Sequence, residues 1–345
     1  MPTLKNRKLL WQLPFLTLLV VGTILIIRQQ RNTPYQHHTG MVFGTVYHIS
    51  YQSESNLKAE IEQCLHAVDS ALSTFNEKSI ISRVNRNEPA TLNPMFVEVF
   101  KLARQVSDDT AGAFDITVAP LVNAWGFGFK QGAMPTARQV DSLRRFVGYK
   151  KVALTAGPAV RKADPRVMLD CSAIAKGYGT DRVAQLLREK GIENFMVEIG
   201  GEVVTKGVSP KRLPWKIGVT KPVDDSLATA EEIQTVLNVT NKAMATSGNY
   251  RNFYYRNGRK YAHTIDPATG YPVQHALLSA TVLANSCAKA DAYATAFMVM
   301  GLDRSRQLLE RHDDLMAYLI YTDQKGELAV WHTPSLDNKI IEEEK

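Results

Sequence analysis

The chain has 345 residues, of which 45% are hydrophobic and 22% charged, an ordinary composition for a globular protein that can bury a sizeable core. Its formal net charge of +7 comes mostly from residues 1–34, which carry five basic residues and no acid, and the other 36 basic and 34 acidic residues argue against nucleic acid as the main partner. Three cysteines without a metal-binding spacing make a disulfide framework or a Cys/His metal site unexpected.

The N-terminus contains an uncharged apolar run of 19 residues at 9–27, close to the length that spans a bilayer. No small-residue cleavage pattern ends this run, which favours an uncleaved signal anchor over a cleaved signal peptide. Three basic residues precede it and two follow, so the sequence predicts a cytoplasmic tail at 1–8 and a single-pass helix in an inner membrane. A polar linker at 28–40, a domain at 41–335 facing the periplasm and a polar tail at 336–345 would follow.

The body of the chain mixes helical and strand patterns irregularly, which predicts an α+β fold with antiparallel sheet rather than a doubly wound parallel sheet. The assignments rest on apolar periodicity, on turn residues and on helix caps such as Asn93. In chain order the expected elements are a strand at 43–51, helices at 57–75, 93–108, 135–147 and 172–190, strands at 195–199, 202–207 and 215–220, a hairpin at 251–265, a strand at 278–284, a helix at 286–300 and a hairpin at 316–331.

Four segments carry residues suited to chemistry, and none is specific alone. The first is the junction LDCSAIAKGYGTDR at 169–182, where Asp170 precedes a helix that opens with small residues and contains Lys176. Backbone groups at such a junction can hold a phosphate or offer a carbonyl to a metal. No Walker or Rossmann glycine pattern is present, and an ordinary capped helix explains the segment equally well.

The second segment, residues 111–128, alternates glycines with Phe114, Trp125 and Phe127. Aromatic side chains beside flexible backbone suit a flat ring system, although a buried aromatic cluster would look the same. The third contains His263, which precedes the turn residues Asp266-Pro267. It is a candidate general base, while a structural role is common for a single histidine.

The fourth segment places Asp291 and Thr295 four residues apart in the expected helix at 286–300. That spacing puts both side chains on one face, and a carboxylate with a hydroxyl suits magnesium better than zinc. Each residue also has a common structural role, as a helix-dipole partner or as a packing residue.

Together these segments resemble the FAD:protein FMN transferase (ApbE) family. The resemblance runs from about Phe43 to Gly301 through five blocks in order: FGTVY, STFNEKSIISRVN, GAFDITVAPLVNAWGFG, LDCSAIAKGYGTDR with ENFMVEIGG, and ATSGNYRN…HTIDPATGYPV…ADAYAT. Departures are small: Phe43 stands where many members have Met, Ser172-Ala173 replaces a Gly-Gly pair, and no cysteine follows the apolar run for lipid attachment.

The resemblance implies a two-lobed α+β fold of antiparallel sheets and packed helices, with FAD between the lobes. It implies a Mg²⁺ site made by Asp291, Thr295 and the backbone carbonyl of Ala173, with His263 as the base. It also implies a glycine turn near the cofactor at Gly200-Gly201. The implied FAD-lining residues are Phe43, Phe75, Ala113, Phe114, Asp115, Asp170, Lys176, Thr264 and Ile265.

The implied activity is magnesium-dependent transfer of FMN from FAD to a Thr or Ser hydroxyl of an acceptor flavoprotein, with release of AMP. The implied acceptors are flavoprotein subunits of membrane electron-transport complexes. Two alternatives stay open: a magnesium-dependent FAD pyrophosphatase, in which water is the nucleophile, and a flavin-binding protein without chemistry on the flavin.

Overall fold

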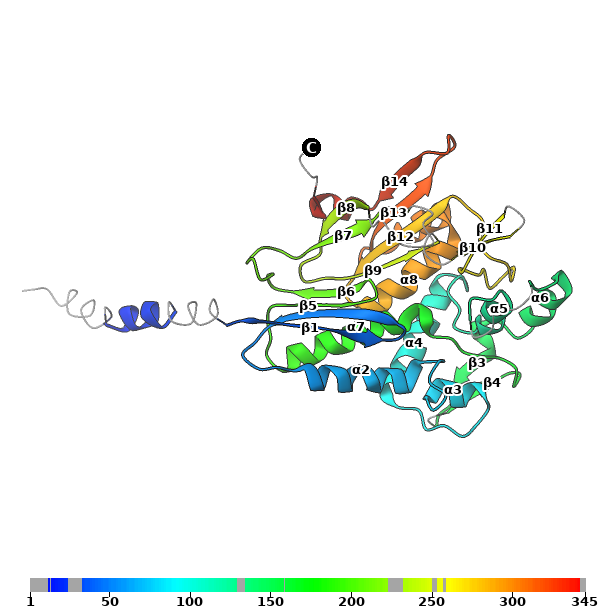
Figure 1. Ribbon diagram of the computed structural model, residues 1–345, viewed down its shortest axis with the longest axis horizontal. Helices are drawn as coiled ribbons and strands as arrows, with labels where there is room; N and C mark the ends of the chain where they lie inside the picture. Colours follow the sequence, from blue (N-terminus) through cyan, green and yellow to red (C-terminus); the bar gives the residue numbers. More distant parts are fainter. Residues whose placement is uncertain are drawn as a thin grey trace, which may run out of the picture.

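The computed structural model describes residues 12, 14–23, 33–128, 134–157, 159–222, 232–249, 253–256 and 259–341. An eight-stranded sheet in the order β1-β2-β5-β6-β9-β12-β13-β14 lies at the centre, and all its neighbouring strands are antiparallel (Figure 1). This confirms the predicted α+β class with antiparallel sheets. Its strands are β1 (Tyr35–Val42), β2 (Thr45–Gln52), β5 (Phe195–Ile199), β6 (Glu202–Lys206), β9 (Ala243–Gly248), β12 (Leu277–Ala284), β13 (Met316–Thr322) and β14 (Leu328–His332).

Helices cover one face of this sheet in two layers, and α7 and α2 can be seen below β1 and β5 in Figure 1. In the inner layer α7 (Ser172–Glu189) packs on β5 and β6, and α8 (Cys287–Met300) packs on β9 and β12. In the outer layer α2 (Lys58–Leu72) packs against α7, and α4 (Pro94–Asp109) packs against α8. The shorter helices are α3 (Ile80–Asn85), α5 (Ala119–Ala124), α6 (Ala137–Arg144), α9 (Leu302–Leu309) and the 3₁₀ helices η1 (Tyr149–Lys151) and η2 (Pro334–Lys339).

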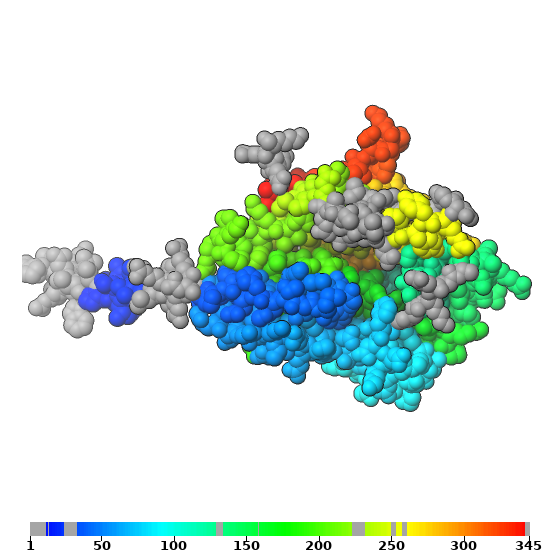
Figure 2. All heavy atoms as spheres, in the orientation of Figure 1, coloured from blue at the N-terminus to red at the C-terminus, as the bar shows by residue number. Residues whose placement is uncertain are grey.

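The opposite face of the sheet is covered by a second, three-stranded sheet in the order β15-β8-β7. Apolar side chains from both sheets form a core in which Leu336 is fully buried. The β13–β14 hairpin projects from the body near this sheet (Figure 2). The remaining strands are β7 (Lys216–Thr220), β8 (Ile233–Asn238), β15 (Ile340–Ile341) and the paired β3 (Val152–Leu154) with β4 (Val160–Lys162) and β10 (Phe253–Arg256) with β11 (Arg259–Ala262).

The backbones of α7 and α8 touch, and this contact positions the residues discussed below. A Cβ atom on Gly177 would lie 2.4 Å from the carbonyl oxygen of Cys287, so only glycine fits there. One turn later on α7, the Asp181 carboxylate accepts hydrogen bonds from the Ser286 hydroxyl at 2.8 Å and from the N–H groups of Cys287 and Ala288 at 2.8 and 2.9 Å. Thus α7 supplies a carboxylate to the otherwise unpaired N–H groups at the start of α8.

Both ends of the folded part lie beyond the predicted limits of 41–335. Strand β1 begins at Tyr35, inside the predicted linker 28–40, and pairs with β2 along its whole length. The predicted polar tail at 336–345 likewise contributes the buried Leu336 and strand β15. These segments escaped the sequence analysis because β1 is a polar edge strand and the end of the chain offers only isolated apolar residues.

The predicted membrane anchor at 9–27 is described only in part. Residues 14–23 are helical, and residues 9–11, 13 and 24–27 lie outside the described residues, together with the predicted cytoplasmic tail. In the part of the chain that is described, no helix has both the length and the apolar character needed to cross a membrane. The anchor therefore stays a prediction.

Candidate functional site

A cavity of about 850 Å³ opens where the helical layer, the β5–β6 turn and the segment after β11 meet. Its volume lies in the range of small-molecule and cofactor sites. All thirteen residues that the family resemblance assigns to the site line it, as do the two glycines of the β5–β6 turn. They are Phe43, Phe75, Ala113, Phe114, Asp115, Asp170, Ala173, Lys176, His263, Thr264, Ile265, Asp291 and Thr295.

The cavity contains a cluster of charged side chains on three elements. The Nζ atom of Lys176 on α7 lies 2.6 Å from Oε1 of Glu202, the first residue of β6. The N–H of the adjacent Gly177 donates a hydrogen bond to Oδ2 of Asp291 on α8 at 3.0 Å. Both carboxylates are 2% exposed, so two buried acids flank one ammonium group.

The electrostatics of this cluster follow from burial. Burial raises the pKa of the Asp291 carboxyl, although the Lys176 ammonium opposes that shift. Burial, with a smaller contribution from Asp291, raises the pKa of Glu202 against the lowering effect of Lys176. Burial alone would lower the pKa of Lys176, but the two carboxylates raise it above its usual value. Two desolvated acids beside a single cation favour the arrival of further positive charge.

The residues present fit a bound Mg²⁺ ion. Asp291 and Thr295 both line the cavity, and the Thr295 hydroxyl lies 3.2 Å from the Ser247 hydroxyl. In a regular helix the N–H of Gly177 would donate to the Ala173 carbonyl. Here the Gly177 N–H also donates to Asp291. The Ala173 carbonyl oxygen, which has two lone pairs, can therefore accept a further partner. No group of three His, Cys, Asp or Glu side chains with metal-site geometry occurs in the described part of the chain. Hydroxyl, carbonyl and water oxygens would complete the coordination, as is usual for Mg²⁺.

Two further acidic residues that were predicted to line FAD accept hydrogen bonds from other residues of the chain. Asp115 accepts hydrogen bonds from the Thr117 N–H and hydroxyl at 2.7 and 2.6 Å and from the Tyr149 N–H at 2.7 Å. Burial raises its pKa despite these bonds. Asp170 accepts from the Ser172 N–H at 2.8 Å and from the Ser172 hydroxyl at 2.5 Å, which fixes the start of α7. Both carboxylates therefore shape the wall of the cavity.

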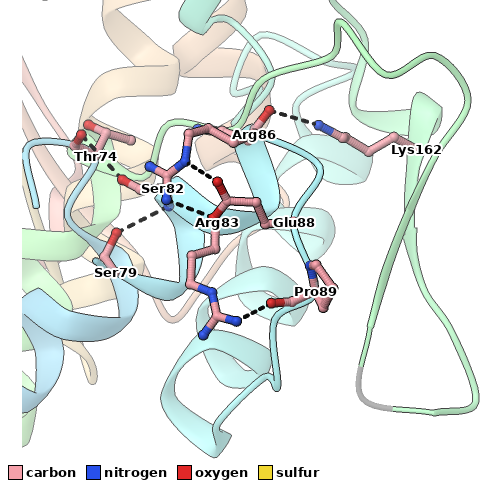
Figure 3. Close-up of polar contacts among 9 residues, drawn as sticks. Thr74, Ser79, Ser82, Arg83, Arg86, Glu88, Pro89 and Lys162 are labelled. Carbon is pink, nitrogen blue, oxygen red and sulfur yellow. Dashed lines mark hydrogen bonds and ion pairs between the residues drawn. The ribbon is translucent and has the colours of Figure 1, made fainter. Parts of the chain in front are cut away.

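The rim of the cavity carries Phe75, whose side chain is 72% exposed. The preceding residue Thr74 is tied to α3, because its carbonyl accepts a hydrogen bond from the Ser82 hydroxyl at 3.4 Å (Figure 3). Ser79 caps α3 by accepting from the Ser82 N–H at 3.1 Å. The hydrogen bonds of Asn85 with the Leu169 N–H and carbonyl, at 2.7 and 2.8 Å, then join this helix to the segment that precedes α7.

The wall around His263 is built from aromatic rings. His263 faces the edge of the Phe127 ring with 6.4 Å between ring centroids. Phe127 stacks on Tyr254. Phe127 and Phe114 both line the cavity. Trp125 does not line it: this side chain is buried in a small separate core, where its N–H donates to the Gly270 carbonyl at 2.8 Å. Phe114 and Phe127 thus lie where the ring-binding interpretation needs them, which stays a prediction, and Trp125 fits the buried-cluster interpretation.

Of the titratable residues that line the cavity, the sequence analysis missed three: His48, Glu198 and Glu202. His48 and Glu198 are direct partners across β2 and β5, with Nδ1 and Oε2 3.7 Å apart, and Glu198 also accepts from the Gly201 N–H at 2.7 Å. The signal for Glu202 was a charged residue inside an apolar strand directly after two glycines. The His48–Glu198 pair depends on strand register, which the sequence does not reveal.

Comparisons with known proteins agree on one family. A model described as "ApbE family" matches residues 43–320. The chain is 37% identical over 314 residues to the FAD:protein FMN transferase of Haemophilus influenzae, covering 86% of this chain and 89% of that protein. It is also 37% identical to the FAD:protein FMN transferase of Vibrio cholerae, covering 83% and 88% of the two chains.

Solved structures give the same result. The flavin transferase ApbE from Vibrio cholerae superposes with a TM-score of 0.79 and 34% sequence identity, covering 89% of this chain and 99% of that one. The apo form of the flavinyl transferase ApbE from Pseudomonas stutzeri superposes with a TM-score of 0.78 and 31% identity, covering 88% and 96%. The similarity therefore includes the whole cavity-forming part of the fold.

Proposed function

This chain belongs to the ApbE family, and we propose that it transfers FMN from FAD to a Thr or Ser hydroxyl of an acceptor flavoprotein and releases AMP. The observation that carries the proposal is the convergence of thirteen residues, drawn from segments across the chain, on one cavity. A cofactor-sized cavity lined by phenylalanines at one part and by a charged, oxygen-rich cluster at another suits a molecule with a flat ring and a pyrophosphate.

In the proposed reaction the acceptor oxygen attacks the FMN-side phosphorus, and the bond from that phosphorus to the bridging oxygen breaks, so AMP leaves with the bridging oxygen. His263 takes the proton of the attacking hydroxyl, and a positioned base of this kind typically contributes ~10²–10⁴-fold in rate. Lys176 and the start of α7 provide positive charge beside the phosphates. A Mg²⁺ ion held by Asp291, Thr295 and the Ala173 carbonyl would neutralise phosphate charge when bound.

The proposal is tested by incubating the full chain with FAD, MgCl₂ and a candidate acceptor, followed by mass spectrometry of the acceptor and chromatography of the nucleotides. Wild-type protein should attach FMN and release AMP in equal amounts. Asp291→Asn should lose transfer by removing the carboxylate charge. His263→Ala should bind FAD with near-normal affinity but transfer slowly; a normal rate in this variant would remove His263 from the mechanism.

The same assay separates the hydrolytic alternative. A pyrophosphatase would release free FMN and AMP with the acceptor unmodified, because water would replace the hydroxyl. A flavin-binding protein without catalysis would release no AMP. Either result would overturn the transferase assignment for this chain.

We also propose that the apolar run at 9–27 anchors the chain in the inner membrane with the catalytic domain in the periplasm, where membrane electron-transport flavoproteins would be its partners. The run itself and the flanking basic residues support this. Protease digestion of intact spheroplasts should remove the catalytic domain and spare cytoplasmic markers. Protection of the domain from the protease would refute the orientation.

A further inference from the structure

Glu202 has a carboxylate that the protein uses only in part. Its side chain is 2% exposed, and Oε1 forms a 2.6 Å contact with the Lys176 ammonium. Its Oε2 atom is buried and has no hydrogen-bond partner among the residues that the structure describes. A buried, unpaired carboxylate oxygen is costly, and such an atom in a native fold calls for a bound water, ion or ligand as its partner.

The position of this carboxylate is fixed by the backbone. Glu202 opens β6 directly after Gly200 and Gly201, whose φ values of +63° and +102° favour glycine. A Cβ atom on Gly200 would lie 2.7 Å from the Thr45 side chain, so β2 packs tightly against this turn. Glu202 pairs with Ile199 in the β5–β6 ladder. The turn and the ladder therefore fix the backbone from which the Glu202 side chain starts.

Glu202 also lies close to the candidate cation-binding residues. Glu202 contacts Lys176, and Asp291 accepts from the N–H of the next residue, Gly177, so both carboxylates contact adjacent residues of α7. When all three side chains are ionised, the two acids exceed the single ammonium by one negative charge. Oε1 forms the contact with the Lys176 ammonium, and Oε2 remains as an acceptor without a partner on a residue that lines the cavity.

We propose that Glu202 is a second carboxylate of the divalent-cation site, acting through Oε2 on the cation or on a water bound to it. This inference rests on the proposed function only for the presence of a cation at Asp291, and it adds Glu202 to the residues that hold it. An outer partner of this kind typically changes metal affinity by roughly 10–100-fold. Glu202 is therefore expected to determine how tightly the site holds a cation before any nucleotide is bound.

The test uses Mn²⁺ as a spectroscopic probe, titrated by electron paramagnetic resonance into the full chain without nucleotide. Glu202→Gln keeps the shape and an oxygen for Lys176 but removes the charge, and it should weaken Mn²⁺ binding about 10-fold or more. Glu202→Asp keeps the charge and should bind Mn²⁺ more tightly than the glutamine variant. The matched control is Glu198→Gln, which lines the same cavity but has both oxygens engaged; its Mn²⁺ affinity should stay within about twofold of wild type.

The outcomes are separable. If Asp291→Asn loses Mn²⁺ binding and Glu202→Gln retains wild-type affinity, the cation site at Asp291 is supported. The proposed role of Glu202 is then refuted. If Asp291→Asn also retains wild-type affinity, the cation site of the proposed function is itself wrong. If Glu202→Gln lowers the melting temperature with Mn²⁺ affinity unchanged, Glu202 only holds Lys176 in place, and the inference is overturned.

Discussion

Replacing Asp181 by alanine should destabilise the protein and loosen the helix that carries Asp291. The Asp181 carboxylate joins α7 to the start of α8 through hydrogen bonds from Ser286, Cys287 and Ala288. Alanine removes all three bonds and leaves two backbone N–H groups at a helix start without their acceptor.

The magnitude follows from those contacts. Hydrogen bonds to a charged group contribute ~1.5–3 kcal/mol each, so three of them give roughly 5 kcal/mol before any cost is subtracted. Burial raises the pKa of Asp181, which indicates that desolvation of the carboxylate offsets part of this gain. A net loss of about 2–3 kcal/mol remains, equivalent to a fall in Tm of roughly 3–5 °C for a chain of this size.

Guanidinium and thermal unfolding of wild type, Asp181→Ala, Asp181→Asn and Ser286→Ala would measure this loss. The asparagine variant keeps one acceptor oxygen and should lie between wild type and alanine, whereas Ser286→Ala removes a single hydroxyl and should cost about 1 kcal/mol. An Asp181→Ala protein as stable as wild type would refute the claim that α7 caps α8.

Three further predictions follow from the same packing. Gly177→Ala should cost ~1–3 kcal/mol in a denaturant titration, because the new methyl group would press on the Cys287 carbonyl, and a neutral result would show that the two helices can separate freely. Burial raises the pKa of both the Cys171 and Cys287 thiols, so neither should react with a thiol reagent in the native protein at pH 8, and rapid labelling detected by peptide mass spectrometry would contradict their burial. Trp125→Phe should lower the free energy of unfolding by about 1 kcal/mol or more through loss of the Gly270 hydrogen bond, and unchanged thermal unfolding would argue against that bond.

Local signals in the sequence predicted most helices and many strands. The Asn93 cap marks the start of α4 by accepting from the Phe96 N–H at 2.9 Å, and Gly301, with φ +76°, ends α8. The helix expected from 135 to 147 is α6 at Ala137–Arg144, and its start is set by a capping box between Thr136 and Gln139. Such caps depend on residues only a few positions apart, so they can be predicted from the sequence.

Non-local pairing was harder to predict. The central strand β9 has the sequence AMATSG, whose small residues give no strand pattern, and it is held by pairing with β12 and β6. The edge strand β1 is held by its ladder with β2 rather than by an apolar face. In both cases the partner strand decides the structure, so propensity alone could not reveal it.

The same difference between local signals and non-local pairing decided which cavity residues could be predicted. Asp291 and Thr295 were found because helical spacing and a family resemblance both pointed to them, and the structure brings them to the same cavity as Phe43, more than 240 positions earlier in the sequence. Glu202 and the His48 partner of Glu198 were not found, because only the folded sheet shows which oxygen is unpaired and which residues are opposite each other.

The most direct test of the central claim is a single-turnover reaction of the full chain with FAD, MgCl₂ and an acceptor protein that offers one Thr or Ser hydroxyl for modification. The account predicts a gain by the acceptor of the mass of FMN less one water, in step with AMP release, and no gain with Asp291→Asn protein. Appearance of free FMN with an unmodified acceptor, or normal labelling by the Asp291→Asn variant, would contradict it.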